Sequence, residues 1–226
     1  MATPAPATPL YRHPSLDELA ARALRLAHGR RALLGVVGEP GAGKSTFAAQ
    51  LLARLHRTHP GLAVGVSMDA FHLAHRVLTA RGQVAHKGTP DTFDGHGFLA
   101  LLRRTVVETE HGVWWPEFDR EVEDSVCAAV EVAPAHQLVV VDGNFLLCDS
   151  PPWHGVRGTL DEAWFLDASP APRRERLLRR YVHHGFTPED ARAKVDGVDA
   201  RTSALVRGTL GRADLVLTEG PADRDG

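Results

Sequence analysis

A glycine-rich run at residues 38–45 constrains the fold of this chain more than any other feature. It fits the pattern G-x-x-x-x-G-K-[ST] at every defined position, and its members are Gly38, Glu39, Pro40, Gly41, Ala42, Gly43, Lys44 and Ser45. The apolar residues 32–37 before it predict a short buried strand, and residues 46–55 after it predict an amphipathic helix. Strand, glycine loop and helix in this order are the context in which the motif binds phosphate.

This run predicts a cradle for the phosphates of a nucleoside triphosphate. Glycines let the backbone turn its N–H groups inward around a phosphate chain, and the start of the following helix, where Thr46 lies, adds partial positive charge. Lys44 can reach the outer phosphates, and the Ser45 hydroxyl can bind Mg²⁺. We therefore expect a bound nucleotide with Mg²⁺, and the fate of its last phosphate depends on the other residues of the site.

Length, composition and charge favour one α/β domain acting on a small molecule. A chain of 226 residues with 43% hydrophobic residues can bury one sizeable core. A net charge of −2 offers no basic field for nucleic acid or an anionic membrane, and no apolar run has the length of a bilayer span. Cys127 and Cys148 fit free thiols in a reducing compartment. We expect a cytoplasmic protein without nucleic-acid or membrane partners; the oligomeric state stays open, with a homodimer as the commonest default.

Apolar segments and helical patterns alternate along the chain. Strands are expected at 32–37, 62–67, 138–141, 163–167 and 214–218, and helices at 15–28, 46–55, 98–110, 170–183 and from 187 onward. The predicted fold is α/β, a P-loop NTPase three-layer sandwich with a mainly parallel sheet, helices on both faces and a helical lid. Residues 73–96 predict a long functional loop with a helical turn or two, and residues 114–120 an irregular stretch.

Acidic residues follow several of the predicted strands. Because ligands gather at the carboxyl ends of strands in an open parallel sheet, Asp69, Asp142 and Asp167 are site candidates. Asp142 follows an apolar strand, as a carboxylate that holds Mg²⁺ does, or it is an ordinary turn residue before Gly143. Asp69 has the position of a general base for an incoming hydroxyl, with a helix N-cap as its alternative role. Asp167 is most simply a loop or cap residue.

Four further segments resemble motifs of the phosphoribulokinase/uridine kinase family, and above all of its pantothenate kinase-like "nucleoside/nucleotide kinase" branch. They are residues 68–73 (MDAFHL), 86–94 (HKGTPDTFD), 116–120 (PEFDR) and 141–147 (VDGNFLL). The resemblance extends from about Leu33 to Leu217. It implies ATP-dependent, Mg²⁺-dependent phosphorylation of a hydroxyl on a small molecule. On this basis we assign residues 1–14 to a disordered lead-in, 15–220 to a single P-loop kinase domain with its lid at about 170–208, and 221–226 to a tail.

The resemblance also implies roles for individual residues. Asp69 matches the family's general base, whereas Lys87 and Arg120 match contacts to the acceptor and the phosphates. The same motifs assign Phe71, His72 and Asn144 to acceptor binding. The metal is assigned to Ser45 by the P-loop pattern and to Asp142 by its position after an apolar strand.

The sequence departs from the family pattern at several of these motifs. It has Ala70 where the family often has Gly, His75 where it often has Asn, and Asp142 where it often has Glu. The shorter Asp142 side chain favours a metal contact through water.

By the same resemblance, the arginine-rich helix that includes residues 173–180 matches the family's lid. Helical spacing places Arg173, Arg176 and Arg180 on one face, where guanidinium groups could offset charge on a transferring phosphoryl group. We assign Arg173 and Arg176 to that role, and a solvated basic face is the alternative. Among the aromatic residues, Trp114, Trp115 and Phe118 either form a wall of the acceptor site or pack in the core.

Other functional classes remain to be weighed against a kinase. A GTPase usually reads guanine through Asn-Lys-x-Asp, but Asn144 is the only Asn in the chain and Phe145 follows it. A nucleotide-binding ATPase or regulatory module without phosphotransfer is the other alternative. Within the kinase class the sequence leaves the acceptor open, and we rank a nucleoside first, a fructose-type sugar second and pantothenate third.

Overall fold

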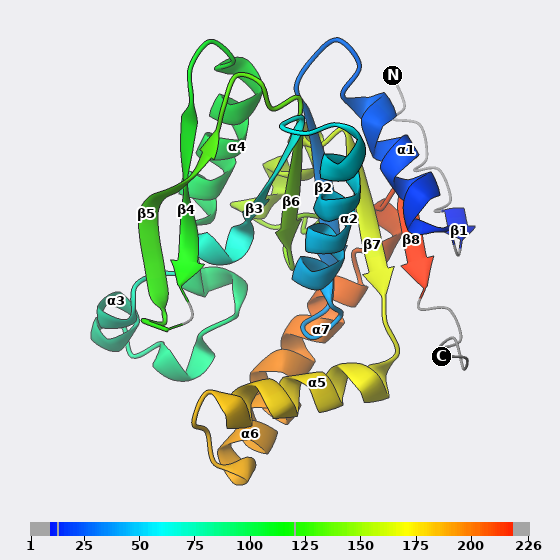
Figure 1. The fold of residues 1–226 in the computed structure, drawn as a ribbon. Helices are drawn as coiled ribbons and strands as arrows, with labels where there is room; N and C mark the ends of the chain where they lie inside the picture. The colour runs from blue at the N-terminus through cyan, green and yellow to red at the C-terminus, as the bar shows by residue number, and fades with distance from the viewer. Residues whose placement is uncertain (1–9, 13, 120, 219–226) are drawn as a thin grey trace, which may run out of the picture.

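The computed structural model describes residues 10–12, 14–119 and 121–218, and they build a parallel sheet between layers of helices (Figure 1). The sheet is six-stranded, in the order β1-β8-β7-β2-β6-β3, and every neighbouring pair is parallel. Its strands are β1 (Leu10–Arg12), β2 (Ala32–Gly38), β3 (Ala63–Ser67), β6 (Leu138–Gly143), β7 (Glu162–Asp167) and β8 (Leu215–Thr218). The predicted α/β sandwich with a parallel sheet is confirmed.

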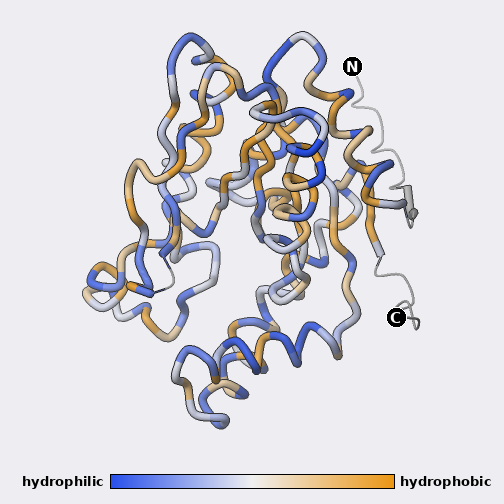
Figure 2. The backbone as a smooth tube through the Cα atoms, in the orientation of Figure 1, coloured by the Kyte–Doolittle hydropathy of each residue, from blue (hydrophilic) through white to orange (hydrophobic). Residues whose placement is uncertain are grey.

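The interior strands β2 and β6 bury side chains on both faces, which is why their sequences are continuous apolar runs. Leu33 and Val37 of β2 and Val139 and Val141 of β6 join one core cluster, in which α4 (Gly95–Val107) contributes Phe98, Leu99 and Leu102. Leu34 and Val36 of β2 and Leu138 and Val140 of β6 join the other cluster, with residues of α1 (Leu16–Leu26) and α2 (Lys44–Thr58). Figure 2 shows this hydrophobic centre as orange strands. The sheet is therefore covered on both faces.

An antiparallel hairpin beside the main sheet overturns one prediction. The residues expected to be irregular up to Asp119 form β4 (Val113–Asp119), which pairs with β5 (Asp124–Val132). The register shifts between Trp115 and Glu117, at Pro116, and this irregularity hid the period of two from the sequence analysis. Trp115 is fully buried and its Nε1 donates to Thr105 Oγ1 at 2.9 Å, so it packs in the core, whereas Trp114 is exposed.

Two peripheral segments also bear on the predicted boundaries. Residues 10–12 were placed in a disordered lead-in, but they form β1 because the edge of β8 offers them a parallel backbone partner. Residues 1–9 and 13 of the lead-in and the predicted tail, 221–226, lie outside the described residues. In the long loop, α3 (His75–Ala80) and two 3₁₀ turns, Val84–His86 and Pro90–Thr92, supply the expected helical turns.

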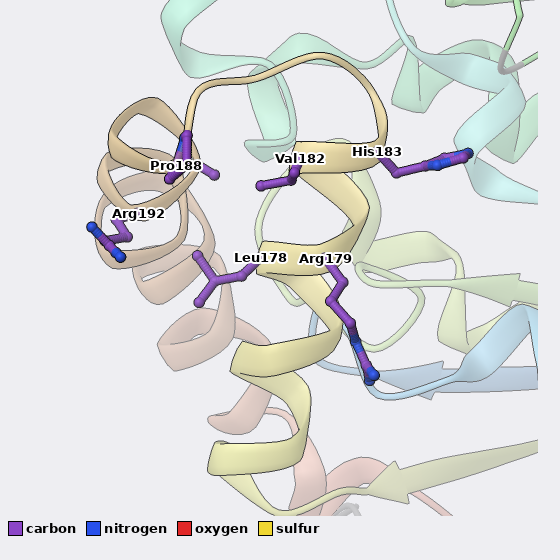
Figure 3. Close-up of a pocket in the computed structure, with 7 residues that line it drawn as sticks. Leu178, Arg179, Val182, His183, Pro188 and Arg192 are labelled. Carbon is purple, nitrogen blue, oxygen red and sulfur yellow. The ribbon is translucent and has the colours of Figure 1, made fainter.

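The lid consists of helices that lie beyond the carboxyl ends of the strands (Figure 1). These are α5 (Pro170–His183), α6 (Pro188–Lys194), a π-helix (Val195–Asp199) and α7 (Ala200–Arg207). Leu177, Tyr181, Ala191 and Val195 form its own small apolar cluster. A cavity of 490 Å³ lies between α5 and α6, and none of its lining residues belongs to the P-loop. Figure 3 shows these residues, among them Leu178 and Val182 of α5 and Pro188 and Arg192 of α6. In the described part of the chain, no helix is both long and apolar enough for a bilayer span.

Arg31 connects the end of α4 to the turn before β6. Its buried guanidinium donates to the carbonyl oxygens of Thr105, Glu108, Ala133 and His136 at 2.8 to 3.0 Å. We predict that Arg31→Met lowers the free energy of unfolding by about 2–4 kcal/mol, because buried carbonyls lose their donor. Arg30→Met is the matched control: Arg30 pairs with Asp161 at the surface, and its loss should cost less than about 1 kcal/mol. Equal losses in urea denaturation would contradict this role of Arg31.

Candidate active site

The glycine loop leaves the central strand β2 at the edge of the sheet that faces the lid. Gly41 has φ +77°, a conformation that side chains rarely adopt. A Cβ atom at Gly41 would lie 2.8 Å from the Arg173 carbonyl oxygen and 3.0 Å from Leu177 Cγ of α5. The loop therefore takes glycine here for two reasons, its backbone conformation and the close approach of the lid helix.

Ser45 and Asp142 meet at the centre of the candidate site. Ser45 lies in the first turn of α2, and its Oγ donates to Asp142 Oδ2 at 2.7 Å. The parallel register places Val37 opposite Gly143, so β2 and β6 end side by side and bring the two residues together. Lys44 precedes Ser45, and its Nζ donates to the carbonyl oxygen of Glu39 at 3.2 Å, within the loop itself.

The charges at this edge act on one another. Burial raises the pKa of Asp142, and the nearby Asp69 carboxylate raises it further, whereas the Ser45 hydroxyl and Lys44 lower it. Burial lowers the pKa of Lys44 to about 8, against the opposite influence of Asp69 and Asp142. The structure thus brings Lys44, Asp69 and Asp142 together as the sequence predicted. A bound triphosphate would add negative charge beside Lys44 and so favour its charged ammonium form.

Asp69 lies on the 3₁₀ turn Met68–Phe71 that directly follows β3. The N-cap of this turn is Ser67, whose Oγ accepts from the Asp69 backbone N–H at 3.2 Å. The capping role considered for the Asp69 side chain therefore belongs to Ser67. Since β3 pairs with β6 and Ser67 lies opposite Asp142, the half-buried Asp69 stands beside the metal candidate.

His72, Lys87 and Phe118 gather next to Asp69, and we call this region the acceptor side. The His72 ring lies 3.9 Å from Phe93 and 5.2 Å from Phe118 between centroids, and its Nδ1 is 2.8 Å from the Asp69 carbonyl oxygen. Lys87 Nζ lies 5.0 Å from the centre of the Phe118 ring. Burial lowers the pKa of His72, and both Asp69 and Lys87 are close enough to act on it. Lys87 is thus not a solvated loop lysine.

The remaining predicted acceptor residues have different surroundings. Phe71 packs edge-on against Phe98 and Trp115 at 5.2 and 5.7 Å, so its ring belongs to the border of the core. Asn144 Oδ1 is buried, and within the described residues it has no hydrogen-bond partner, as expected of a group that meets a ligand. Arg120 lies outside the described residues.

The lid arginines contact the P-loop itself. Arg173 is buried; its Nη2 donates to Glu39 Oε1 at 2.8 Å, and its Nη1 donates to the Pro40 carbonyl oxygen at 3.0 Å. Arg176 Nη1 donates to the Gly41 carbonyl oxygen at 3.2 Å. Arg180, which helical spacing placed on the same face but which was not assigned a role, is exposed, and its charge acts on Lys44.

A cavity of 440 Å³ adjoins the P-loop on the side of β7 and β8. It is lined by Glu39, Asp167, Ala168, Ser169, Pro170, Arg207 and Thr218. Arg207 Nη1 pairs with Asp167 and lies 3.7 Å from Glu39 Oε2. Asp167, expected to be a loop or cap residue, thus borders a space that begins at the phosphate cradle.

The donors present fit Mg²⁺ bound together with phosphate. Among the described residues no group of three or more His, Cys, Asp or Glu side chains forms a metal cage. Mg²⁺ in nucleotide sites takes one or two protein oxygens and completes its shell with phosphates and water. The paired Ser45 hydroxyl and buried Asp142 carboxylate match that requirement.

Comparison with known proteins identifies the relatives of the chain. No protein-family model matches it. A protein of Schizosaccharomyces pombe named "Putative uridine kinase" is 30% identical over 214 residues, which covers 91% of both chains. The crystal structure of a "putative fructose transport system kinase" from Silicibacter sp. TM1040 superposes with a TM-score of 0.80 at 32% identity, covering 90% of this chain and 98% of that one. YFH7 of Saccharomyces cerevisiae shares the fold at 18% identity, with a TM-score of 0.77 over 91% of this chain and 99% of that one.

Gly41 provides a test of the contact between lid and loop. We predict that Gly41→Ala lowers the free energy of unfolding by at least about 2 kcal/mol and weakens Mg·ATP binding about tenfold, because its Cβ would displace α5. Gly61→Ala is the matched control: Gly61 also has positive φ but no atom within 4 Å of an added Cβ, so it should lose only about 1 kcal/mol. Thermal denaturation and calorimetric ATP titration measure both. Equal changes in stability and in ATP affinity in the two variants would show that α5 does not pack closely enough against the loop to exclude a Cβ atom at Gly41.

Proposed function

The chain belongs to the P-loop kinases of the uridine kinase type, and from this premise we propose that it transfers the γ-phosphate of ATP to a hydroxyl group of a small molecule. The observation that carries the proposal is the convergence of Lys44, Ser45, Asp69 and Asp142 at one edge of the sheet. A nucleotide-binding loop alone would also suit a switch protein or an ATPase. The Asp69 carboxylate, just after the end of β3 and beside Asp142, is the additional element that hydroxyl activation requires.

The phosphates of ATP are assigned to the loop and its nucleoside part to the cavity beside it. The loop backbone and the first turn of α2 present N–H groups and partial positive charge to the phosphate chain. The cavity lined by Glu39, Asp167 and Arg207 begins where the loop begins. Ser45 and Asp142 would hold Mg²⁺, which supplies charge neutralisation to the phosphate oxygens when bound.

Asp69 is assigned to the proton transfer. The acceptor hydroxyl oxygen forms the new bond to the γ-phosphorus, the bond from that phosphorus to the β-γ bridging oxygen breaks, and the hydroxyl proton moves to the Asp69 carboxylate. Lys44 offsets charge on the phosphate oxygens. Arg173 and Arg176 support the step by holding the lid on the loop, through Glu39, Pro40 and Gly41.

The acceptor is a hydroxyl compound from one of three classes. Names of relatives point to a nucleoside and to a fructose-type sugar, and the sequence motifs add pantothenate. A panel of uridine, cytidine, adenosine, pantothenate, fructose, ribose and ribulose 5-phosphate with Mg·ATP separates them by acceptor-dependent ADP release. Guanine-specific behaviour is tested by replacing ATP with GTP in the same assay.

The general-base role of Asp69 gives a direct prediction. Asp69→Asn should keep the affinity for Mg·ATP and lower turnover at least about a hundredfold, because the amide accepts no proton. Asp149→Asn, at an exposed carboxylate that pairs with Arg212, is the matched control and should leave turnover unchanged. Steady-state rates and ATP titrations of both variants measure this. Near-normal turnover of Asp69→Asn would remove Asp69 from the proton transfer.

A further inference from the structure

Three cationic side chains gather where the lid meets the acceptor side. Arg180 and Lys194 lie 5.3 and 5.4 Å from the centre of the same Tyr181 ring. Lys194 Nζ donates to the carbonyl oxygen of Lys87 at 3.3 Å, so the third cation comes from the loop below the lid. This concentration of positive charge lies beside the predicted acceptor residue Lys87, in a chain whose net charge is −2.

The lid and the loop are in direct contact here. Besides Lys194, Thr202 Oγ1 donates to the Gly88 carbonyl oxygen at 3.4 Å, and Val198 Cγ1 lies 4.0 Å from where a Gly88 Cβ would stand. Val198 belongs to the π-helix, a rare element that is frequent at functional sites. These contacts hold the lid on the backbone of the loop, and the two ammonium groups are near enough that the Lys87 charge, after burial, helps to lower the pKa of Lys194.

Asp199, at the end of the π-helix, is the buried counter-charge of the cluster. It is 7% exposed, and its Oδ2 has no hydrogen-bond partner within the part of the chain that the structure describes. Burial raises its pKa, and Tyr181, Arg180 and Lys194 oppose that effect. A buried, unpartnered carboxylate oxygen is costly unless water or a ligand meets it. Asp199 thus opposes the charges of Arg180 and Lys194 inside the lid, whereas the counter-charge of Lys87 comes from Glu123.

Lys87 already forms an ion pair with a carboxylate of this chain, that of Glu123. Glu123 Oε2 accepts from Lys87 Nζ at 3.1 Å, and the Glu123 carbonyl oxygen accepts from the same atom at 3.2 Å. Glu123 has φ 54°, which is uncommon for a residue with a side chain, and its side chain is 54% exposed. Because the Glu123 side of this ion pair is largely exposed to solvent, the pair is weak, and another anion can replace the carboxylate at small cost.

We propose that the acceptor carries an anionic group, a carboxylate or a phosphomonoester, which binds Lys87 and Lys194 in place of the Glu123 carboxylate. The inference rests on the proposed function and names the class of its acceptor. Lys87 and Asp69 both lie close to His72, so one small molecule can present its anion to the lysines and its hydroxyl to Asp69. A neutral nucleoside or sugar has no anionic group that could replace the Glu123 carboxylate on Lys87. The structure thus favours hydroxy acids and sugar phosphates over the nucleosides that the sequence ranked first.

Matched pairs of acceptors test the charge requirement. In each pair the neutral member has a hydroxyl group in place of the anion and shares all other hydroxyl groups: glycerate against glycerol, pantothenate against pantothenyl alcohol, and ribulose 5-phosphate against ribulose. We expect kcat/KM for the anionic member of at least one pair to exceed that of its neutral partner at least about tenfold. Preference within the first two pairs indicates a carboxylate, and within the third a phosphomonoester. Equal or better use of the neutral members would overturn the inference and leave the kinase function standing.

Charge variants test the residues. Lys194→Met should raise KM for the preferred anion at least about tenfold with KM for ATP unchanged, and Lys194→Arg should restore most of the affinity. Glu123→Gln should lower KM for the same anion, because the competing carboxylate is gone. Arg192→Met on α6 and Glu121→Gln on the hairpin turn are the matched controls, since both side chains are exposed and neither contacts Lys87. An unchanged KM in Lys194→Met would overturn the assignment.

Calorimetric titration of the same pairs with a non-hydrolysable ATP analogue present separates binding from transfer. Tighter binding of the anionic members, lost in Lys194→Met, supports the anion site even if no phosphate is transferred, in which case only the proposed function fails. Absence of binding by every anionic member overturns the anion site itself.

Discussion

The parallel pairing of β2 with β6 is the constraint on which the site depends. It ends both strands at the same level, so that the loop after β2 and the carboxylate after Val141 face each other. The hydrogen bond from Ser45 to Asp142 is a direct result. The next strand, β3, pairs with β6 in the same direction and brings Asp69 to that edge. The residues that we assign to nucleotide, metal and acceptor therefore share one edge, because three neighbouring strands run in parallel.

The lid is attached to this edge mainly through the P-loop. Arg173 and Glu39 form a buried ion pair, and Arg173 also contacts the backbone of Pro40, which satisfies more of its donors. Burial raises the pKa of Glu39 and the Arg173 charge opposes that rise, so each charge needs its partner. This interaction gives Arg173 a positioning task between lid and loop. Arg180, by contrast, has an exposed side chain, and its charge acts on Lys44.

The parts of the fold that could be predicted from the sequence are those with a local sequence pattern. The glycine loop, its flanking strand and helix, and the acidic residues at strand ends follow from period and motif, and the structure brings Lys44, Ser45, Asp69 and Asp142 together accordingly. The hairpin β4–β5 was missed because Pro116 interrupts its alternation, and β1 because its pairing is set by a strand about 200 residues away. Contacts between distant segments, such as Lys87 with Glu123 and Lys194, have no local signal at all.

The central claim is that the γ-phosphate goes to an organic acceptor and not to water. The most direct measurement uses γ-³²P ATP and quantifies how much label appears in inorganic phosphate and how much in organic phosphate, with and without each acceptor of the panel. Our account predicts that at least one acceptor yields labelled organic phosphate in equal amount to the ADP released, while inorganic phosphate stays at the level without acceptor. Label found only in inorganic phosphate, at a rate that no acceptor changes, would contradict it and identify the chain as an ATPase.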